Sequence, residues 1–300
     1  MKTTLTVLAL SLACSSCAVA PMMISGAVSK MDFNDVQNMV SKVSKVADGQ
    51  RDLSMAEEVA LGGGMASDLL GAAPLLQDKK LQRYVNQVGM WLAAQTERSD
   101  LPWRFAVLDD NEFNAFSTPG GYVFITRGLL LSLRNESELA GVLAHEIAHV
   151  VNKHHLAALR LSNGKNVVAD YASTLLDKTP NTTHSILTPA QVKLAASLVT
   201  DVFLRGLNKD DEFEADRMAV VICARAGYDP YGLPAVLQSM AAVNPSYSGV
   251  TLIFKTHPSF AARLDQLTLV MNDAFDKFES QPNMAARFRQ NVPAPKLASR

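Results

Sequence analysis

Apolar residues recur with a helical period along most of the chain, and they alternate with polar residues in one short region. Residues 80–98 repeat leucine and valine at the spacing of an amphipathic helix. Residues 139–155 are apolar around most of the helical circumference, which predicts a buried helix. Residues 102–108 and 122–125 have the composition of strands, with a turn at 119–121 before the second. These patterns predict a mostly helical α+β domain with a small antiparallel sheet beside the buried helix.

Capping and turn residues mark the ends of several predicted helices. Ser54 and Glu57 have the spacing of a capping box, so we expect a helix to begin there. It should continue through Gly62–Gly64, because each glycine costs only about 1 kcal/mol. Another helix contains residues 211–217 and ends at Gly227, ahead of an Asp-Pro pair. Further helices are expected at 189–205, 231–243 and 260–278.

The buried helix carries polar side chains that need partners. His145 and His149 stand four residues apart, so their imidazoles project from one face of the helix, one turn apart. This spacing allows both rings to reach one zinc ion at ~2.0–2.1 Å. Glu146 can then reach a water beside that ion, as in metalloprotease helices. The alternative is a pair of core histidines bonded to backbone carbonyls, but polar groups that stay unpartnered in a core cost several kcal/mol.

A catalytic zinc site needs a third protein ligand, and the sequence offers two candidates. His155 follows His149 by six residues, but residues 153–161 have the pattern of an unbroken helix, on which His155 would rise ~9 Å and turn away. Glu212 and Asp216 stand four apart on another helix and share a face. One carboxylate can bind zinc while the other accepts the outer N–H of a ligand histidine. We therefore expect Glu212 to be the ligand; the alternative is an acidic first helical turn favoured by the helix dipole.

Four separated motifs resemble those of the M48 peptidases, a family of gluzincins. In chain order they are residues 114–129, 145–150, 212–217 and 256–258, with Arg263 beyond. The resemblance covers about residues 57–278 and is greater to the soluble, secreted bacterial branch. It implies a zincin-like metalloprotease domain, polypeptide substrates and one zinc ion per chain. The residues that it implies for the site are the zinc ligands His145, His149 and Glu212, the general base Glu146, and Asp216 behind the ligands.

Two further roles have alternatives. His257, in the last motif, lies near the zinc in the family, where it could donate to the developing oxyanion or latch the site by binding zinc itself. It could also be a turn residue ahead of a proline. Asn114, Ala115 and Phe116 form a candidate edge strand that would hold a substrate by backbone pairing. The alternative there is a hairpin that only packs the core.

The N-terminus has the features of a secretory signal. Residues 1–17 combine one basic residue, an apolar run too short to span a bilayer, and small residues. Cys14 and Cys17 are alternative sites for a lipid that would anchor the protein to the outer membrane. The remaining expected divisions are a linker or helix at 18–52, the peptidase domain at 53–280 and a disordered tail at 281–300.

Composition excludes some classes of partner. The chain has 28 basic and 29 acidic residues, and this balance argues against a nucleic-acid partner. With 300 residues, 48% of them hydrophobic, it can bury a full core. Cys223 lies on an apolar helix, and we expect it to be a buried, unpaired side chain.

The patterns and the resemblance together imply a periplasmic, zinc-dependent endopeptidase that acts on misfolded or unassembled envelope proteins. The alternative is a zinc-binding chaperone or assembly factor in which His257 latches the metal and little proteolysis remains.

Overall fold

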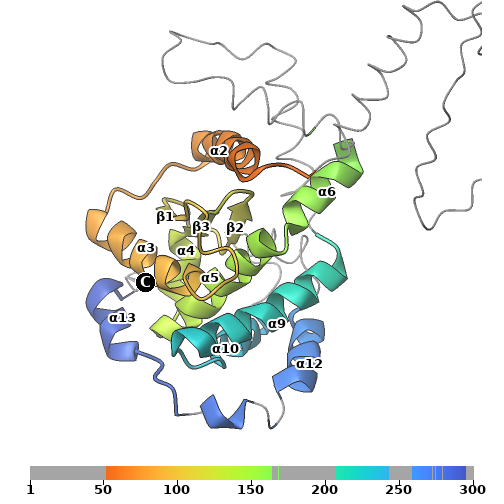
Figure 1. Cartoon of the computed structure of the whole chain (residues 1–300). Coiled ribbons are helices and arrows are strands. Elements are labelled where there is room, and N and C mark those ends of the chain that lie inside the picture. Colours follow the sequence, from red (N-terminus) through yellow and green to blue (C-terminus); the bar gives the residue numbers. More distant parts are fainter. Residues whose placement is uncertain are drawn as a thin grey trace, which may run out of the picture. The chain divides into compact units, whose positions relative to one another are not determined.

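The computed structural model describes residues 52–163, 207–242 and 259–294, with Val168 in isolation and without residues 272, 274 and 279. These residues belong to one unit that begins at Asp48. Figure 1 shows several helices packed around a small sheet. Cys14, Cys17, His257 and the helix expected at 189–205 fall outside the described residues. Within the described ranges, every helix is too short or too polar to cross a membrane.

The sheet has three strands, β1 (Arg104–Leu108), β2 (Ala115–Thr118) and β3 (Tyr122–Thr126), in the order β1-β3-β2. β2 and β3 pair antiparallel across the predicted turn, whereas β1 and β3 pair parallel. The sheet is therefore mixed, and the expectation of an antiparallel sheet holds only for β2 and β3. The difference arises because β3 inserts between the other two strands, which leaves β2 at the edge.

Helix α2 (Met55–Ala72) begins at the predicted capping box. Ser54 accepts a hydrogen bond from the N–H of Glu57, and the Glu57 carboxylate accepts one from the N–H of Ser54 at 2.9 Å. The helix continues through Gly62–Gly64, as expected. Gly62 is needed there because a Cβ would lie 1.6 Å from the carbonyl oxygen of Pro119, in the turn between β2 and β3.

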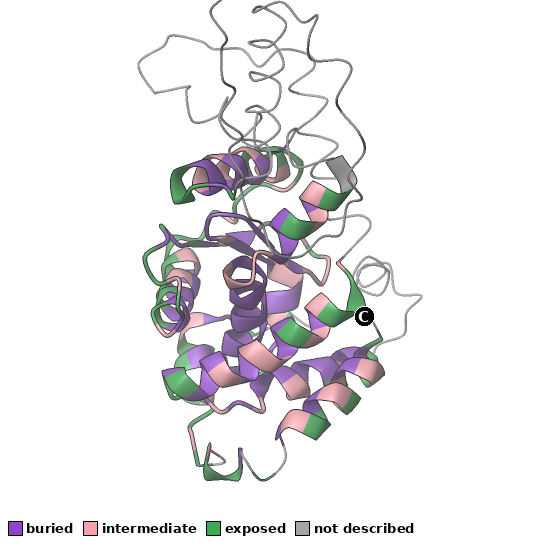
Figure 2. Cartoon of the chain, turned by 45° about the vertical axis from the view of Figure 1, so that its right-hand side comes forward, coloured by how far each residue is buried: buried purple, intermediate pink, exposed green. Residues whose placement is uncertain are grey.

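Helix α5 (Glu136–Val151) lies at the centre of the described unit. Its most extensive contacts are with strand β2 and with the helices α3 (Lys79–Ala93), α9 (Lys209–Ala226) and α10 (Gly232–Ala241). A short helix, α4 (Arg127–Ser132), joins β3 to it. Figure 1 shows α5 between the sheet and α9. Every residue from Glu136 to Val150 is buried, which confirms the prediction from its apolar pattern (Figure 2).

The helix is interrupted after Val151. Asn152 ends α5, Lys153 adopts a left-handed conformation with φ 58°, and α6 (His154–Asn163) follows. The prediction of an unbroken helix over 153–161 is therefore wrong at Lys153. The pattern of side chains did not indicate this break, because lysine does not favour the left-handed region.

The C-terminal part folds back onto the domain. Helix α12 (Phe260–Met271) is shorter than predicted and is followed by a single 3-10 turn, η3 (Asp276–Phe278). Beyond it, α13 (Ala285–Asn291) contacts α3 and α5, and its Phe288 is buried. The expected disordered tail is therefore wrong for residues 281–294. The prolines of this segment flank the short helix and do not interrupt it.

Candidate metal centre

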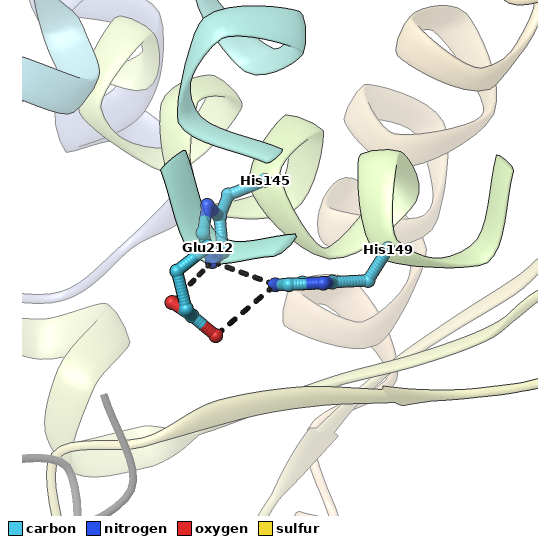
Figure 3. Close-up of side chains that lie close together, drawn as sticks. All are labelled: His145, His149 and Glu212. Atoms are coloured by element: carbon cyan, nitrogen blue, oxygen red, sulfur yellow. Dashed lines mark hydrogen bonds and ion pairs between the residues drawn. The ribbon is translucent and has the colours of Figure 1, made fainter. Parts of the chain in front are cut away.

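Two histidines of α5 and one glutamate of α9 meet in the interior. The Nε2 atoms of His145 and His149 lie 3.0 Å apart. Glu212 stands in the first turn of α9, which packs along α5. Its carboxylate oxygens lie 3.6 Å from Nε2 of His145 and 3.5 Å from Nε2 of His149. Figure 3 shows the three side chains directed toward one another, so the structure brings the three predicted ligands together.

The spacing of these three side chains fits a metal ion. Each offers one ligand atom, and these atoms lie within 4.8 Å of one another. Tetrahedral bonds of ~2.0–2.1 Å place neighbouring ligand atoms ~3.3 Å apart, close to the observed separations. Glu212 is fully buried, and two imidazoles with a carboxylate form a common donor set for a divalent metal. His155, the other candidate ligand, is not part of this group.

Asp216 and Arg263 form a hydrogen-bonded pair on the Nδ1 side of His145, away from the other two ligands. Nδ1 of His145 lies 2.9 Å from Oδ1 of Asp216, which stands one turn after Glu212 as predicted. Arg263 of α12 donates two hydrogen bonds to Asp216, at 2.8 and 2.6 Å. Its guanidinium also lies 3.8 Å from Glu212. Arg263 therefore links the carboxylate behind His145 to the third ligand.

Sequence reasoning assigned no role to Arg263. The signal that could have found it is its position on the buried face of α12, three residues after Phe260 and four before Leu267. A buried arginine requires an acidic partner. The sequence could not show which acidic residue lies opposite, because α9 and α12 are distant along the chain.

The charges of these groups are set by their neighbours. Burial and Arg263 lower the pKa of His145, but hydrogen bonds to Asp216 and Glu212 outweigh both and raise that pKa to about 9. Burial and the charge of His145 lower the pKa of His149 well below its ordinary value. Burial raises the pKa of Asp216, but Arg263 outweighs burial and holds this pKa low. Because a metal-bound imidazole must be neutral, a metal ion has to displace the proton of His145.

His149 has its own outer partner, which comes from α6. Its Nδ1 lies 2.9 Å from Nδ1 of His154, a buried residue. Nε2 of His154 lies 3.6 Å from the half-exposed carboxylate of Glu214. This arrangement was not predicted, because it depends on the interruption of the helix at Lys153.

Glu146 is buried beside the two histidines. Ser117 of β2 donates a hydrogen bond from Oγ to Oε2 of Glu146 at 2.9 Å. Oγ of Ser117 also lies 3.1 Å from the backbone carbonyl oxygen of Glu146. Ser117 is fully buried, and the sequence did not indicate its contact with Glu146. It connects the edge strand to the carboxylate that follows the first histidine.

The residues expected to form an edge strand are in β2. Ala115 and Phe116 pair with β3, while Asn114 lies just before the strand and accepts a hydrogen bond from the N–H of Thr126. In the described sheet β2 is an outer strand. The predicted role in holding a substrate remains a prediction.

An apolar pocket opens beside His145 and Glu146. The helices α5, α10 and α12 supply most of its wall. The apolar side chains that line it include Val142, Leu233, Val236, Leu237, Met240 and Phe260. Apolar side chains therefore adjoin Glu146 on this side of the metal centre.

Comparisons with known proteins agree with this geometry. The sequence profile described as peptidase family M48 matches residues 79–270. This range contains β1–β3, the helices α5 and α9, and all three ligands of the metal centre.

Several curated proteins are similar over the same region. The chain is 31% identical over 216 residues to the beta-barrel assembly-enhancing protease of Escherichia coli strain K12, which covers 71% of this chain and 43% of that protein. It is 28% identical over 197 residues to the mitochondrial metalloendopeptidase OMA1 of Schizosaccharomyces pombe, covering 66% of this chain and 55% of that protein. The chain thus spans about two fifths of the length of the bacterial relative and about half of the mitochondrial one.

Proposed function

The chain belongs to peptidase family M48, and from this premise we propose that it is a zinc-dependent endopeptidase that acts on misfolded or unassembled envelope proteins. The observation that carries the proposal is the buried group of His145, His149 and Glu212, with Glu146 beside it. Three protein ligands and a neighbouring carboxylate are what a hydrolytic zinc site requires.

Zinc is the metal that best fits this donor set in a peptidase. Two histidines and a carboxylate can also hold iron(II) in oxygenases. Here, however, a glutamate directly follows the first histidine on the same helix, which is the pattern of zinc peptidases. When bound, zinc lowers the pKa of a water toward ~7 and polarises the substrate carbonyl.

Glu146 is the proposed general base. Its carboxylate takes a proton from the attacking water. The same carboxylate then delivers this proton to the nitrogen of the leaving amine, so the base is regenerated. Ser117 donates to Oε2 of Glu146 and so fixes the direction of that carboxylate. Asp216 accepts from the outer nitrogen of His145 and keeps its inner nitrogen directed toward Glu212.

We further propose that the substrate lies along β2. An extended chain can add to an outer strand through backbone hydrogen bonds, at Asn114, Ala115 and Phe116. The apolar pocket beside Glu146 would then receive a hydrophobic side chain next to the cleaved bond. Unfolded proteins expose such side chains in extended segments, whereas folded proteins bury them.

An envelope location is part of the proposal. The bacterial relative is called a beta-barrel assembly-enhancing protease, and the first 17 residues have the features of a secretory signal. We propose that this chain acts in the periplasm on envelope polypeptides, with a lipid on Cys14 or Cys17 as a membrane anchor.

The test uses Glu146→Gln and an unfolded, reduced and alkylated protein as substrate. The variant should bind one zinc per chain like the parent and lose hydrolysis by a factor of about 10² or more. Glu97→Gln, which removes a surface carboxylate, is the matched control and should cleave like the parent. Chelation should abolish cleavage and added zinc should restore it. Cleavage by Glu146→Gln at the parental rate would show that Glu146 is not the base.

The same assay distinguishes the proposed peptidase from the alternative, a zinc-binding assembly factor in which His257 latches the metal. If His257 latches the metal, His257→Ala should cleave faster than the parent while zinc content stays the same. A chain that binds zinc but cleaves in neither form would favour a zinc-binding assembly factor over a peptidase.

A further inference from the structure

We propose that His154 is a positioning residue for the metal centre: it fixes the tautomer and the ring orientation of His149, and Glu214 supports it from the surface. The proposal rests on the zinc site of the proposed function. The observation that carries it is the 2.9 Å separation between Nδ1 of His149 and Nδ1 of His154.

The tautomers follow from this separation. Nε2 of His149 faces His145 and Glu212, so this nitrogen must carry a lone pair when it binds a metal. The ring proton of His149 therefore sits on Nδ1. Two nitrogens 2.9 Å apart need one donor and one acceptor, so Nδ1 of His154 accepts. The proton of His154 is then on its Nε2.

The contact between His154 and Glu214 agrees with this assignment of tautomers. Nε2 of His154 lies 3.6 Å from Oε2 of Glu214, close enough for the carboxylate to attract its N–H. The two zinc ligands would thus have different supports. His145 is backed directly by the carboxylate of Asp216, whereas His149 is backed by a second imidazole that precedes the carboxylate of Glu214.

The interruption of the helix makes this contact possible. On a continuous helix, a residue five positions after His149 is rotated by ~140° away from it. The left-handed conformation of Lys153 breaks the helix at that point. The rings of His149 and His154 consequently lie 5.1 Å apart, at an angle of 72°, with His154 only 5% exposed. A left-handed lysine is unfavourable, and such strain is often retained where it positions a functional group.

The experiment compares four variants in the Glu146→Gln background, which prevents self-cleavage. His154→Asn keeps an acceptor near the position of Nδ1, His154→Gln moves it toward Nε2, and His154→Leu removes it. Glu214→Gln removes the outer charge only. Zinc affinity is measured by competition with a chromophoric chelator, and the absorption spectrum of the cobalt(II)-loaded protein reports the ligand geometry. Circular dichroism checks the fold of each variant.

We expect His154→Leu to bind zinc ten- to a hundredfold more weakly than the parent, with an altered cobalt spectrum. The zinc affinity of His154→Asn should stay within about threefold of that of the parent. Glu214→Gln should lose less zinc affinity than His154→Leu, because the carboxylate of Glu214 in the parent is half-exposed. Parental affinity in His154→Leu would overturn the proposal, as would an asparagine variant as weak as the leucine variant. If His154→Leu does not fold, equal affinities of the asparagine and glutamine variants would overturn it.

The result also separates this proposal from the proposed function. A parent chain that binds no zinc would overturn the zinc peptidase itself. A parent that binds one zinc, together with a leucine variant of equal affinity, would overturn only the role of His154.

Discussion

A buried acidic residue fixes the start of the metal-binding helix. Glu136, the first residue of α5, is fully buried and accepts hydrogen bonds from the hydroxyls of Tyr84 and Tyr228, both at 2.7 Å. Arg287 of α13 forms an ion pair with the same carboxylate. A buried carboxylate needs such partners, and the N-terminus of a helix favours its negative charge. Glu136 therefore ties α3, α13 and the turn that follows α9 to the N-terminal end of the helix that carries His145.

These two tyrosines predict a loss of stability at high pH. Burial, followed by the hydrogen bond to Glu136, raises the pKa of both phenols above the ordinary value of 10.0. Because the folded-state pKa is the higher one, their contribution is complete below pH ~10 and is lost as the pH rises further. The free energy of unfolding should fall by up to about 1.4 kcal/mol per pH unit for each tyrosine.

Urea denaturation at several values between about pH 9 and pH 11 measures this slope. Tyr228→Phe removes one of the two groups, so its stability should fall less steeply over the same range. Equal slopes for the parent and this variant would contradict the assignment.

At the scale of elements, the packing of α10 against α5 shapes the pocket beside the metal centre. The two helices approach closely at Gly141, where a Cβ would lie 2.6 Å from the backbone nitrogen of Leu233. Leu233 and Leu237 of α10 in turn line the apolar pocket. The width of this pocket therefore depends on a glycine of the metal-binding helix.

Gly141→Ala should lower the free energy of unfolding by about 1–3 kcal/mol, because the new methyl group meets backbone atoms that cannot rotate away. Gly71→Ala is the matched control, because Gly71 is exposed near the end of α2 and no described atom lies within 4 Å of its Cβ position. This control should gain up to about 1 kcal/mol. Thermal unfolding compares the three proteins, and a Gly141→Ala variant as stable as the parent would refute the close approach.

At the scale of the whole described unit, the C-terminal segment returns to the start of the central helix. The carbonyl of Asn283 accepts a hydrogen bond from the N–H of Ser137, and Phe288 and Val292 are buried against the core. Residues 281–294 thus complete the packing around α5, although they lie beyond the last residue of the family match at 270.

Removal of this segment should destabilise the protein. A chain that ends at Ser280 loses the burial of Phe288 and Val292 and leaves the carboxylate of Glu136 without Arg287. We expect a loss of about 3 kcal/mol or more in the free energy of unfolding. A chain that ends at Ala294 is the control and should unfold like the parent. Equal melting temperatures for the two truncated chains would contradict a structural role for α13.

The sequence by itself determined the features that depend on short-range spacing. The period of apolar residues predicted α3 and α5, strand composition with a turn at 119–121 predicted β1 and β3, and the capping box predicted the start of α2. The four-residue spacing of His145 and His149 placed both on one face, and the carboxylate of Glu212 could be named because the chemistry of the site required a third ligand. Such predictions succeed because side chains within two turns of a helix have fixed relative positions.

Only the tertiary structure decided which distant groups meet. The partners of Asp216, His149, Glu146 and Glu136 come from elements far from them along the chain or from beyond a break in the helix. The position of β3 between β1 and β2, and the return of residues 281–294 to α5, are likewise long-range. The physical reason is that burial specifies that a charged group has a partner, while the packing of whole elements specifies which residue that partner is.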